Sequence, residues 1–270
     1  MARRLGGMVA MDRQRRIGEL IQTRGSIRAS ELVDMFGVTD ETIRRDLAHL
    51  GELGIVQRAH GGAISVPTRN ESDYNWRLEE REAEKVAIGR AAANLVCDRS
   101  TIIIDSGTTT LQLARALQGK RDLVAVTNAV SNANELLKNP NITVVLTGGV
   151  VRPLTLDAVG DLAVNTLRDL HVDQTFLAIS AISLDGGLTY PRFEEVSVKQ
   201  AMINAATEVI LLADSSKFGH NALTRVAPLT AIRRVVTSPG LDPDFQRAME
   251  DMGIEVIVAT PEISKPVLEN

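Results

Sequence analysis

From Lys85 onward, the sequence alternates between amphipathic runs of helix length and short apolar runs of strand length. KVAIGRAAANLV reads as a helix, STIIID reads as a strand, and the alternation continues to a last strand, IEVIVA. Strands that alternate with helices are joined by right-handed crossovers into a parallel sheet. Aromatic residues make up only 3% of the chain, so the core must be mostly aliphatic, as in a parallel sheet covered by helices. Residues 85–270 are therefore predicted to form an α/β domain.

The elements of this domain follow from where each apolar run begins and ends. Because ligands of open parallel sheets bind outside the carboxyl ends of the strands, the residues just after each strand are the ones to inspect. We predict strands at residues 100–105, 122–127, 142–147, 172–180, 208–213, 233–238 and 254–259, and helices at residues 85–96, 110–118, 131–139, 158–168, 193–206 and 242–252.

The stretch DSGTTT, which follows the first of these strands, has the composition of an anion site. Gly107 lets the backbone turn tightly, and the helix that begins here points free N–H groups and the positive end of its dipole into the loop. The hydroxyls add further donors, which favours a phosphate. The alternative is a strand-to-helix turn that is well capped and binds nothing. The predicted ligand contacts in this stretch are Asp105, Ser106, Gly107, Thr108, Thr109 and Thr110.

Polar residues also follow the later strands. Arg152, shortly after a Gly-Gly pair, could hold an anion with two parallel hydrogen bonds, and Lys217 could add a point charge. Each alone could be a surface loop residue, but several at one sheet edge predict a single ligand site. These additional predicted contacts are Thr127, Asn128, Gly148, Gly149, Arg152 and Lys217. Glu195 and Lys199, four residues apart on one predicted helix, are interpreted as a surface ion pair.

The N-terminal segment has a different pattern, centred on residues 37–53. Thr39 is a good N-cap, and Ile43, Leu47 and Leu50 form one apolar stripe. With that stripe buried, Glu41 and Arg45 point outward, and Thr42 and Arg44 lie on the flanks. Residues 26–36 are predicted to form a preceding short helix, and a turn at Gly37 completes a helix-turn-helix, whose second helix can enter the major groove of DNA. The alternative is an ordinary helical hairpin with a solvated charged face.

Two short strands follow, and they favour the DNA-binding interpretation. Residues 54–58 and 63–66 read as strands around the turn Ala59-His60-Gly61-Gly62. A helix-turn-helix followed by a small hairpin is a winged helix, and its wing would place Arg58 and His60 near the phosphate backbone. His60 could equally be a plain turn residue. A first helix at residues 12–24 keeps its arginines off the apolar face, where they approach phosphates or stay solvated.

Charge and composition set the domain boundaries. Residues 1–66 carry ten arginines and no lysine against eight acidic residues, whereas the whole chain has a net charge of −4. The basic excess is small, so DNA contact must come from placed arginines rather than from a general positive field. Residues 67–84 are polar and read as a linker in which Trp76 packs onto one of the domains, the alternative being a dimer contact. We predict a DNA-binding domain at 1–66, a linker at 67–84 and an effector domain at 85–270.

The single cysteine, Cys97, excludes an internal disulfide and fits a reducing compartment. Its flanks predict a buried position at a helix end. No apolar run reaches the roughly 18 residues of a membrane span, and no export signal is present. We therefore expect a cytoplasmic protein without membrane contact, and we predict no metal and no cofactor.

Together these motifs resemble the DeoR family of bacterial transcription regulators. The matching stretches are ELVDMFGVTDETIRRDL, HGGA, DSGTTT, VTN, LTGG followed by Arg152, EEVSVKQAMI and ADSSKFG. The resemblance implies a winged helix-turn-helix followed by a sensor domain with the fold of ribose-5-phosphate isomerases and CoA transferases. It also implies phosphorylated sugars or polyols as inducers and an oligomer, dimer or tetramer, on repeated operator half-sites. One departure is the presence of Ala178 and Ala181 where the family often has glycine, which puts the effector's identity in doubt.

The main hypothesis is a repressor of a carbohydrate catabolic operon that binds double-stranded operator DNA. The predicted DNA contacts are Arg28, Thr39, Glu41, Thr42, Arg44, Arg45, Arg58 and His60. The alternative is a sugar-phosphate isomerase with an appended DNA-binding domain, in which Asp105, Asp185 or Glu195 is the base and Lys217 the electrophile. Against it, no pair of carboxylates is placed so that it demands acid–base chemistry, and we predict no catalytic residue.

Overall fold

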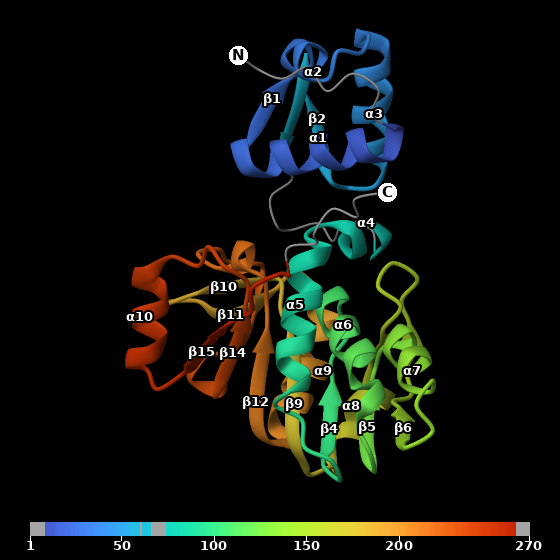
Figure 1. The fold of residues 1–270 in the computed structure, drawn as a ribbon, viewed down its shortest axis with the longest axis vertical. Coiled ribbons are helices and arrows are strands. Elements are labelled where there is room, and N and C mark those ends of the chain that lie inside the picture. The colour runs from blue at the N-terminus through green and yellow to red at the C-terminus, as the bar shows by residue number, and fades with distance from the viewer. Residues whose placement is uncertain (1–8, 60, 66–73, 263–270) are drawn as a thin grey trace, which may run out of the picture. The chain divides into compact units, whose positions relative to one another are not determined.

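The computed structural model describes residues 9–59, 61–65 and 74–262. The chain forms two compact units, Met1–Glu80 and Arg81–Asn270, and Figure 1 shows the elements of each. His60 and residues 66–73 of the predicted linker lie outside the described residues. Among the residues described, no helix combines the length and the apolar character that crossing a membrane requires.

The N-terminal unit is a winged helix. Its helices are α1 (Ala10–Arg24), α2 (Ala29–Phe36) and α3 (Asp40–Glu52), and the short α4 (Tyr74–Glu79) follows the wing. Strands β1 (Ser26–Arg28), β2 (Val56–Ala59) and β3 (Gly62–Ser65) form an antiparallel sheet in the order β1-β3-β2. Strand β1 corrects the sequence prediction, which placed residues 26–28 at the start of the second helix. Only Ile27 of its three residues is buried, and so short a strand leaves little alternation to recognise.

The core of this unit follows the apolar stripe predicted for α3. Ile43, Leu47 and Leu50 are buried against side chains of α1 and α2. Trp76 joins the same core from α4, which confirms that it packs onto one of the domains. Gly18 on α1 makes this possible, because a Cβ at that position would lie 2.5 Å from the indole ring.

The C-terminal unit is built on a seven-stranded parallel sheet, which confirms the predicted fold class. The strand order is β15-β14-β12-β9-β4-β5-β6. The chain therefore runs outward from β4 to one edge and then returns to build the other half from β9. The strands are β4 (Thr101–Ile104), β5 (Leu123–Thr127), β6 (Ile142–Leu146), β9 (Val172–Ala178), β12 (Ala206–Leu212), β14 (Arg234–Thr237) and β15 (Glu255–Val258), and the helices are α5 (Glu82–Ala93), α6 (Thr108–Ala116), α7 (Val130–Leu136), α8 (Asp161–Arg168), α9 (Phe193–Asn204) and α10 (Pro243–Asp251).

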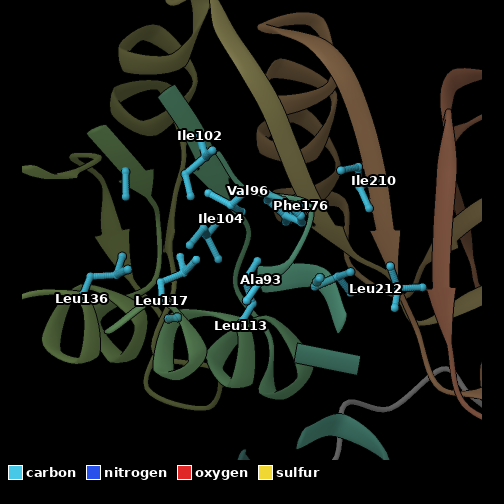
Figure 2. Close-up of a cluster of buried hydrophobic side chains, with 14 of the residues drawn as sticks. Ala93, Val96, Ile102, Ile104, Leu113, Leu117, Leu136, Phe176, Ile210 and Leu212 are labelled. Carbon is cyan, nitrogen blue, oxygen red and sulfur yellow. The ribbon is translucent and has the colours of Figure 1, made fainter. Parts of the chain in front are cut away.

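Alternate residues of β4 face opposite layers of helices. Ile102 and Ile104 pack with side chains of α5, α6 and α7 in one apolar cluster, part of which Figure 2 shows. Ile103 packs with side chains of α8 and α9 in another. Because both faces are covered, the strand is apolar throughout, which is why its sequence reads as a continuous run.

Five short strands of this unit were not predicted from the sequence, and the burial of one residue was predicted wrongly. Strands β10 (Ala181–Ser183), β11 (Gly187–Tyr190) and β13 (Thr224–Ala227) form a separate antiparallel sheet that was not predicted. Strands β7 (Val150–Val151) and β8 (Ala158–Val159) form a hairpin, so the predicted helix at 158–168 begins only at Asp161. The predicted burial of Cys97 is also wrong, because that side chain is exposed and its neighbour Val96 is buried instead.

Candidate DNA-contact surface and ligand site

Helix α3 begins as its sequence predicts. The side chain of its N-cap Thr39 accepts a hydrogen bond from the backbone N–H of Thr42 at 3.2 Å. This cap fixes the start of the helix next to the turn at Gly37, whose left-handed φ of 66° closes α2. Thr39 and Glu41 are exposed and Thr42 is half-buried, so the first turn of α3 is open to solvent.

The two arginines of α3 are held only by weak surface pairs. Nε of Arg44 lies 2.7 Å from Asp40, and Nε of Arg45 lies 3.1 Å from Glu41. The arginine side chains are 66% and 79% exposed. Such pairs contribute little free energy in water, so both guanidinium groups can exchange a carboxylate for a phosphate or a base edge.

The remaining predicted DNA contacts lie on the small sheet. Arg28 ends β1 opposite Gly62, and Arg58 lies on β2 opposite Ala63, and both arginines are exposed. The stem of Arg58 lies near α3, since a Cβ on Gly51 would be 3.5 Å from its Cγ. The wing arginine Arg58 therefore lies close to the helix that carries Arg44 and Arg45.

Arg13 of α1 does not fit the expectation that it faces phosphates or solvent. Its side chain is buried, and Nε lies 2.6 Å from Oδ2 of Asp46 on α3. Gln14 donates to the same carboxylate at 2.8 Å. Arg13 thus ties α1 to α3 inside the unit, because the helical position of Asp46 lies on the buried side rather than the solvent side.

In the C-terminal unit, the first strand of the sheet is locked to its neighbour at the point where the chain topology reverses. Asp105 follows β4, and its backbone N–H donates to the carbonyl of Phe176 on β9 at 3.0 Å. Its carboxylate accepts hydrogen bonds from the N–H groups of Ser106 at 2.8 Å and Ala178 at 3.0 Å. The loop at the head of α6 is therefore held at the switch point of the sheet, where open α/β folds bind ligands.

We call residues 106–110 the SGTTT bend. Within it, Ser106, Thr108 and Thr109 are mostly buried and Gly107 is half-buried. Gly107 is required by close approach, because a Cβ there would lie 2.9 Å from the methyl group of Ala178. One of the two unusual alanines thus lies directly against the bend.

Thr110 and Asp105 hold the bend from inside. Thr110 is fully buried and its hydroxyl donates to the carbonyl of Gly107 at 3.0 Å. The buried amide of Asn132 donates to the carbonyl of Asp105 at 3.0 Å. The hydroxyl of Thr127 donates to the carbonyl of Ile104 at 2.7 Å, which fixes the end of β5 to β4.

Lys199 of α9 forms a buried ion pair with Asp105. Its Nζ lies 2.6 Å from Oδ2 of Asp105, donates to the carbonyl of Ala178 at 3.1 Å and lies 4.5 Å from the centroid of the Tyr190 ring. The two side chains are 1% and 0% exposed. The prediction of a surface pair between Lys199 and Glu195 is therefore wrong. Their helix turns this face toward the sheet, so both charges are buried and each finds a partner on another element.

The charge of Lys199 is maintained by its surroundings. Burial alone lowers the pKa of this lysine, but the Asp105 carboxylate, with smaller contributions from Tyr190 and Asp157, raises the pKa above its ordinary value of 10.5. Lys199 therefore stays an ammonium group at neutral pH.

Glu195 is instead paired with Arg152 of the β7–β8 hairpin. A guanidinium N–H of Arg152 donates to Oε1 of Glu195, which is buried. The backbone N–H of Arg152 donates to the carbonyl of Asp157 at 2.9 Å, closing the hairpin. Gly149 at its base has φ of 132° and lies so close to Val159 that a Cβ would be 2.6 Å from the Val159 carbonyl. The hairpin thus carries Arg152 and the buried Asp157 toward α9.

The other predicted ligand residues are spread along the same edge. Asn128 is buried and its amide donates to the carbonyl of Ala158 at 3.3 Å, and Gly148 is exposed after β6. Arg152 pairs with Glu195, and Asp105 pairs with Lys199. Lys217 follows β12, two strands away from β4 in the sheet.

Beside Lys217, Asp214 caps a short 3₁₀ helix (Ser215–Lys217) at the end of β12. Burial alone raises its pKa, but Lys217, Ser216, Lys85 and Arg81 together bring the pKa below the ordinary value of 3.8. Asp214 therefore carries its negative charge at neutral pH although it is almost completely buried.

The sequence analysis did not identify Asp157 or Tyr190 as part of this region, and it misjudged Lys199. The available signal lay in α9, where Glu195, Lys199 and Met202 fall at i, i+4 and i+7 and are all buried. Charged residues on the buried face of a helix are rare unless they are paired, so they indicate an ion pair or a functional site.

Residues 13–69 match the DeoR-like helix-turn-helix domain, and residues 80–239 match the DeoR C-terminal sensor domain. The chain belongs to the DeoR family. It is 37% identical over 250 residues to an uncharacterized HTH-type transcriptional regulator of Bacillus subtilis, covering 92% of this chain and 96% of that protein. It is 31% identical to the glycerol-3-phosphate regulon repressor of Escherichia coli, covering 92% of this chain and 99% of that protein.

As a member of the DeoR family, the chain is a DNA-binding transcription regulator and not an enzyme. The chain is similar to ribose-5-phosphate isomerase A from Neisseria gonorrhoeae, with 17% identity, a TM-score of 0.37 and coverage of 50% of this chain and 52% of that one. A likeness at that level carries no argument about activity. Of the bases named for the isomerase alternative, Asp105 and Glu195 are each neutralised by a cation, and Asp185 is exposed in the β10–β11 turn.

Proposed function

We propose that this regulator represses a carbohydrate catabolic operon and that a phosphorylated sugar or polyol, bound at the carboxyl edge of the sheet, relieves repression. The relative in Escherichia coli is named as the repressor of a glycerol-3-phosphate regulon, which fits this class of control. We further propose that the chain works as a homo-oligomer, a dimer or tetramer, because winged-helix regulators reach specific affinity by binding paired half-sites.

The observation that carries the ligand proposal is the position of the SGTTT bend. It joins β4 to the N-terminus of α6 at the topological switch point, so helix N–H groups and hydroxyls gather where sheet ligands bind. Ser106, Gly107, Thr108 and Thr109 would contact the phosphate. Asp105, Thr110 and Thr127, whose polar groups are engaged within the protein, would hold the shape of the bend.

Arg152 would be the cation of this site that changes its partner when the ligand binds. It is already paired with Glu195, so a phosphate must share or replace that carboxylate. A dianionic phosphate is a strong bidentate partner for a guanidinium group. Movement of Arg152 would carry the β7–β8 hairpin with it, and Gly148, Gly149 and Asn128 at the base of the hairpin would adjust around the ligand. Lys217 would act on the ligand only at longer range.

On DNA, the exposed first turns of α3 would enter the major groove. Thr39, Glu41, Thr42, Arg44 and Arg45 would share base edges and phosphates there, and Arg28 and Arg58 would contact the backbone. His60 is proposed as a backbone contact from the sequence alone. If the ligand-bound protein prefers an arrangement that binds DNA less well, linkage makes the ligand an inducer.

The test is operator binding measured by fluorescence anisotropy, with the DNA upstream of the protein's own gene and a panel of sugar and polyol phosphates. We expect one of these phosphates to weaken DNA binding, and Thr109→Val to reduce that effect while leaving DNA binding intact. The control Thr166→Val removes a hydroxyl from α8, where it donates to the Leu162 carbonyl. Undisturbed induction in Thr109→Val would show that the phosphate site has been placed wrongly.

A further inference from the structure

Two buried carboxylates near the SGTTT bend each have one oxygen without a donor. Asp157 and Glu195 are 0% and 1% exposed. Oδ1 of Asp157 accepts from the Thr155 hydroxyl, and Oε1 of Glu195 accepts from Arg152. Among the residues that the structure describes, Oδ2 of Asp157 and Oε2 of Glu195 receive no hydrogen bond. A buried acceptor left unpaired is costly and uncommon in native proteins, so both oxygens call for a donor.

Both carboxylates belong to residues that contact Arg152. Glu195 accepts a hydrogen bond from the guanidinium group of Arg152, and the carbonyl of Asp157 accepts the backbone N–H of Arg152 at 2.9 Å. Glu195 also lies one turn before Lys199 on α9. Lys199 in turn contacts Asp105 at 2.6 Å, and the next residue is Ser106 of the bend. The two carboxylates are therefore connected to the proposed phosphate site through Arg152, Lys199 and Asp105.

The charges around these two oxygens indicate which kind of hydrogen-bond donor could bind them. Three carboxylates, those of Asp105, Asp157 and Glu195, surround two cations, Lys199 and Arg152, so the cluster is net negative. A phosphate dianion offers no proton and is repelled by a carboxylate. Within the described part of the chain, no group of three or more His, Cys, Asp or Glu side chains could hold a metal ion. A neutral hydroxyl donates a proton to a carboxylate without adding charge, and a polyol offers several.

We propose that Asp157 and Glu195 form a hydroxyl-binding subsite, which selects phosphate esters with free hydroxyls on the carbon chain over inorganic phosphate or simple alkyl phosphates. This inference rests on the proposed function, because it assumes that the phosphate lies on the SGTTT bend. The buried oxygen Oδ1 of Asn128, which is also unpaired among the described residues, lies after β5 and extends the same set of acceptors.

The first test uses the unmodified chain and isothermal titration calorimetry. The ligands are glycerol 3-phosphate, ribose 5-phosphate and sorbitol 6-phosphate, compared with propyl phosphate and inorganic phosphate. If each of two hydrogen bonds contributes about tenfold, the best hydroxylated ester should bind roughly 100-fold more tightly than propyl phosphate. Equal affinity for hydroxylated and alkyl phosphates would overturn the subsite and leave the phosphate site standing. Binding of none of the five would overturn both proposals.

The second test removes one acceptor. Asp157→Ala should weaken binding of the best hydroxylated ester about tenfold and leave the affinity for propyl phosphate unchanged. The matched control is Asp161→Ala, which removes an exposed carboxylate four residues later at the start of α8. If Asp157→Ala does not fold, Glu195→Ala is measured in the same way. A variant that loses affinity equally for both ligands would contradict the subsite.

Discussion

Helix α3 places Glu41 four residues before Arg45, and helix α9 places Glu195 four residues before Lys199. In α3 the two side chains pair with each other on the surface at 3.1 Å. In α9 both side chains are buried and neither pairs with the other, since Lys199 binds Asp105 and Glu195 binds Arg152. The same spacing thus gives one exposed ion pair within α3, whereas in α9 it gives two buried ion pairs to other parts of the fold.

The difference lies in what covers each helix. The face of α3 opposite Ile43, Leu47 and Leu50 stays open, so its charges remain solvated and available to a partner. One face of α9 is covered by other parts of the unit, so the charges of Glu195 and Lys199 on that face must be neutralised within the protein. Exposed pairs are suited to exchanging partners, whereas buried pairs fix geometry.

The largest expected effect tests the buried side of this comparison. Lys199→Met should destabilise the C-terminal unit by about 3–5 kcal/mol, because the Asp105 carboxylate would be buried without its cation. The measurement is urea denaturation followed by circular dichroism. The control Lys138→Met removes an exposed lysine from Glu135, which keeps a second pair with Arg115, so stability should change by less than about 1 kcal/mol. Equal losses in the two variants would break the comparison.

For the exposed pair on α3, we expect a substitution to weaken DNA binding and to leave the stability of the fold nearly unchanged. Arg45→Ala should cost about 1–3 kcal/mol of operator affinity if the arginine reads a guanine, while the free energy of unfolding stays nearly unchanged. Fluorescence anisotropy and denaturation on the same preparations separate the two quantities. Arg247→Ala, which removes an exposed arginine paired with Asp244 on α10, is the matched control. Unchanged operator affinity would remove Arg45 from the DNA contacts.

A smaller effect concerns pH. The pKa of Asp214 is lowered in the folded state, so its stabilising contribution is present above the unfolded value of 3.8 and is lost as pH falls through the folded pKa. Asp214→Asn should therefore be less stable than the unmodified chain at neutral pH, and this difference should shrink below pH 3.8. Thermal unfolding across this range measures it. The matched control is Asp169→Asn, the same substitution at an exposed position after α8.

The smallest effect concerns Glu41. Glu41→Gln should destabilise the N-terminal unit by only about 0.5 kcal/mol, because it loses one surface pair and a favourable charge near the helix N-terminus. If Glu41 competes with DNA for Arg45, operator affinity should rise slightly. A loss above about 2 kcal/mol would mean that this pair is structural and not weakly held.

Much of the fold was predictable because local signals agreed with it. Thr39 caps α3, the apolar stripe of α3 is buried, and the seven parallel strands follow the predicted apolar runs. The strands β1, β10, β11 and β13 were not predicted because they are only three or four residues long, and their pairing depends on distant segments. The boundary near Ala158 was misjudged because β8 is only two residues long and is followed at once by Gly160, the N-cap of α8.

The candidate ligand site was predictable only in part. The SGTTT bend is visible in sequence because its residues are consecutive, and Arg152 stands out beside a Gly-Gly pair. The partners of Lys199 and Glu195 come from the residue after β4 and from the β7–β8 hairpin, 94 and 43 residues away. Spacing along a single helix cannot report such pairing, since it depends on which element packs against that helix.

The position of Trp76 has a practical consequence. It is the only tryptophan in the chain, and its indole lies in the apolar core of the N-terminal unit beside Gly18. Intrinsic indole emission therefore reports the melting of the winged helix alone, while the larger unit remains optically silent at that wavelength. Comparison with circular dichroism, to which both units contribute, then separates the unfolding of the two units without any attached dye.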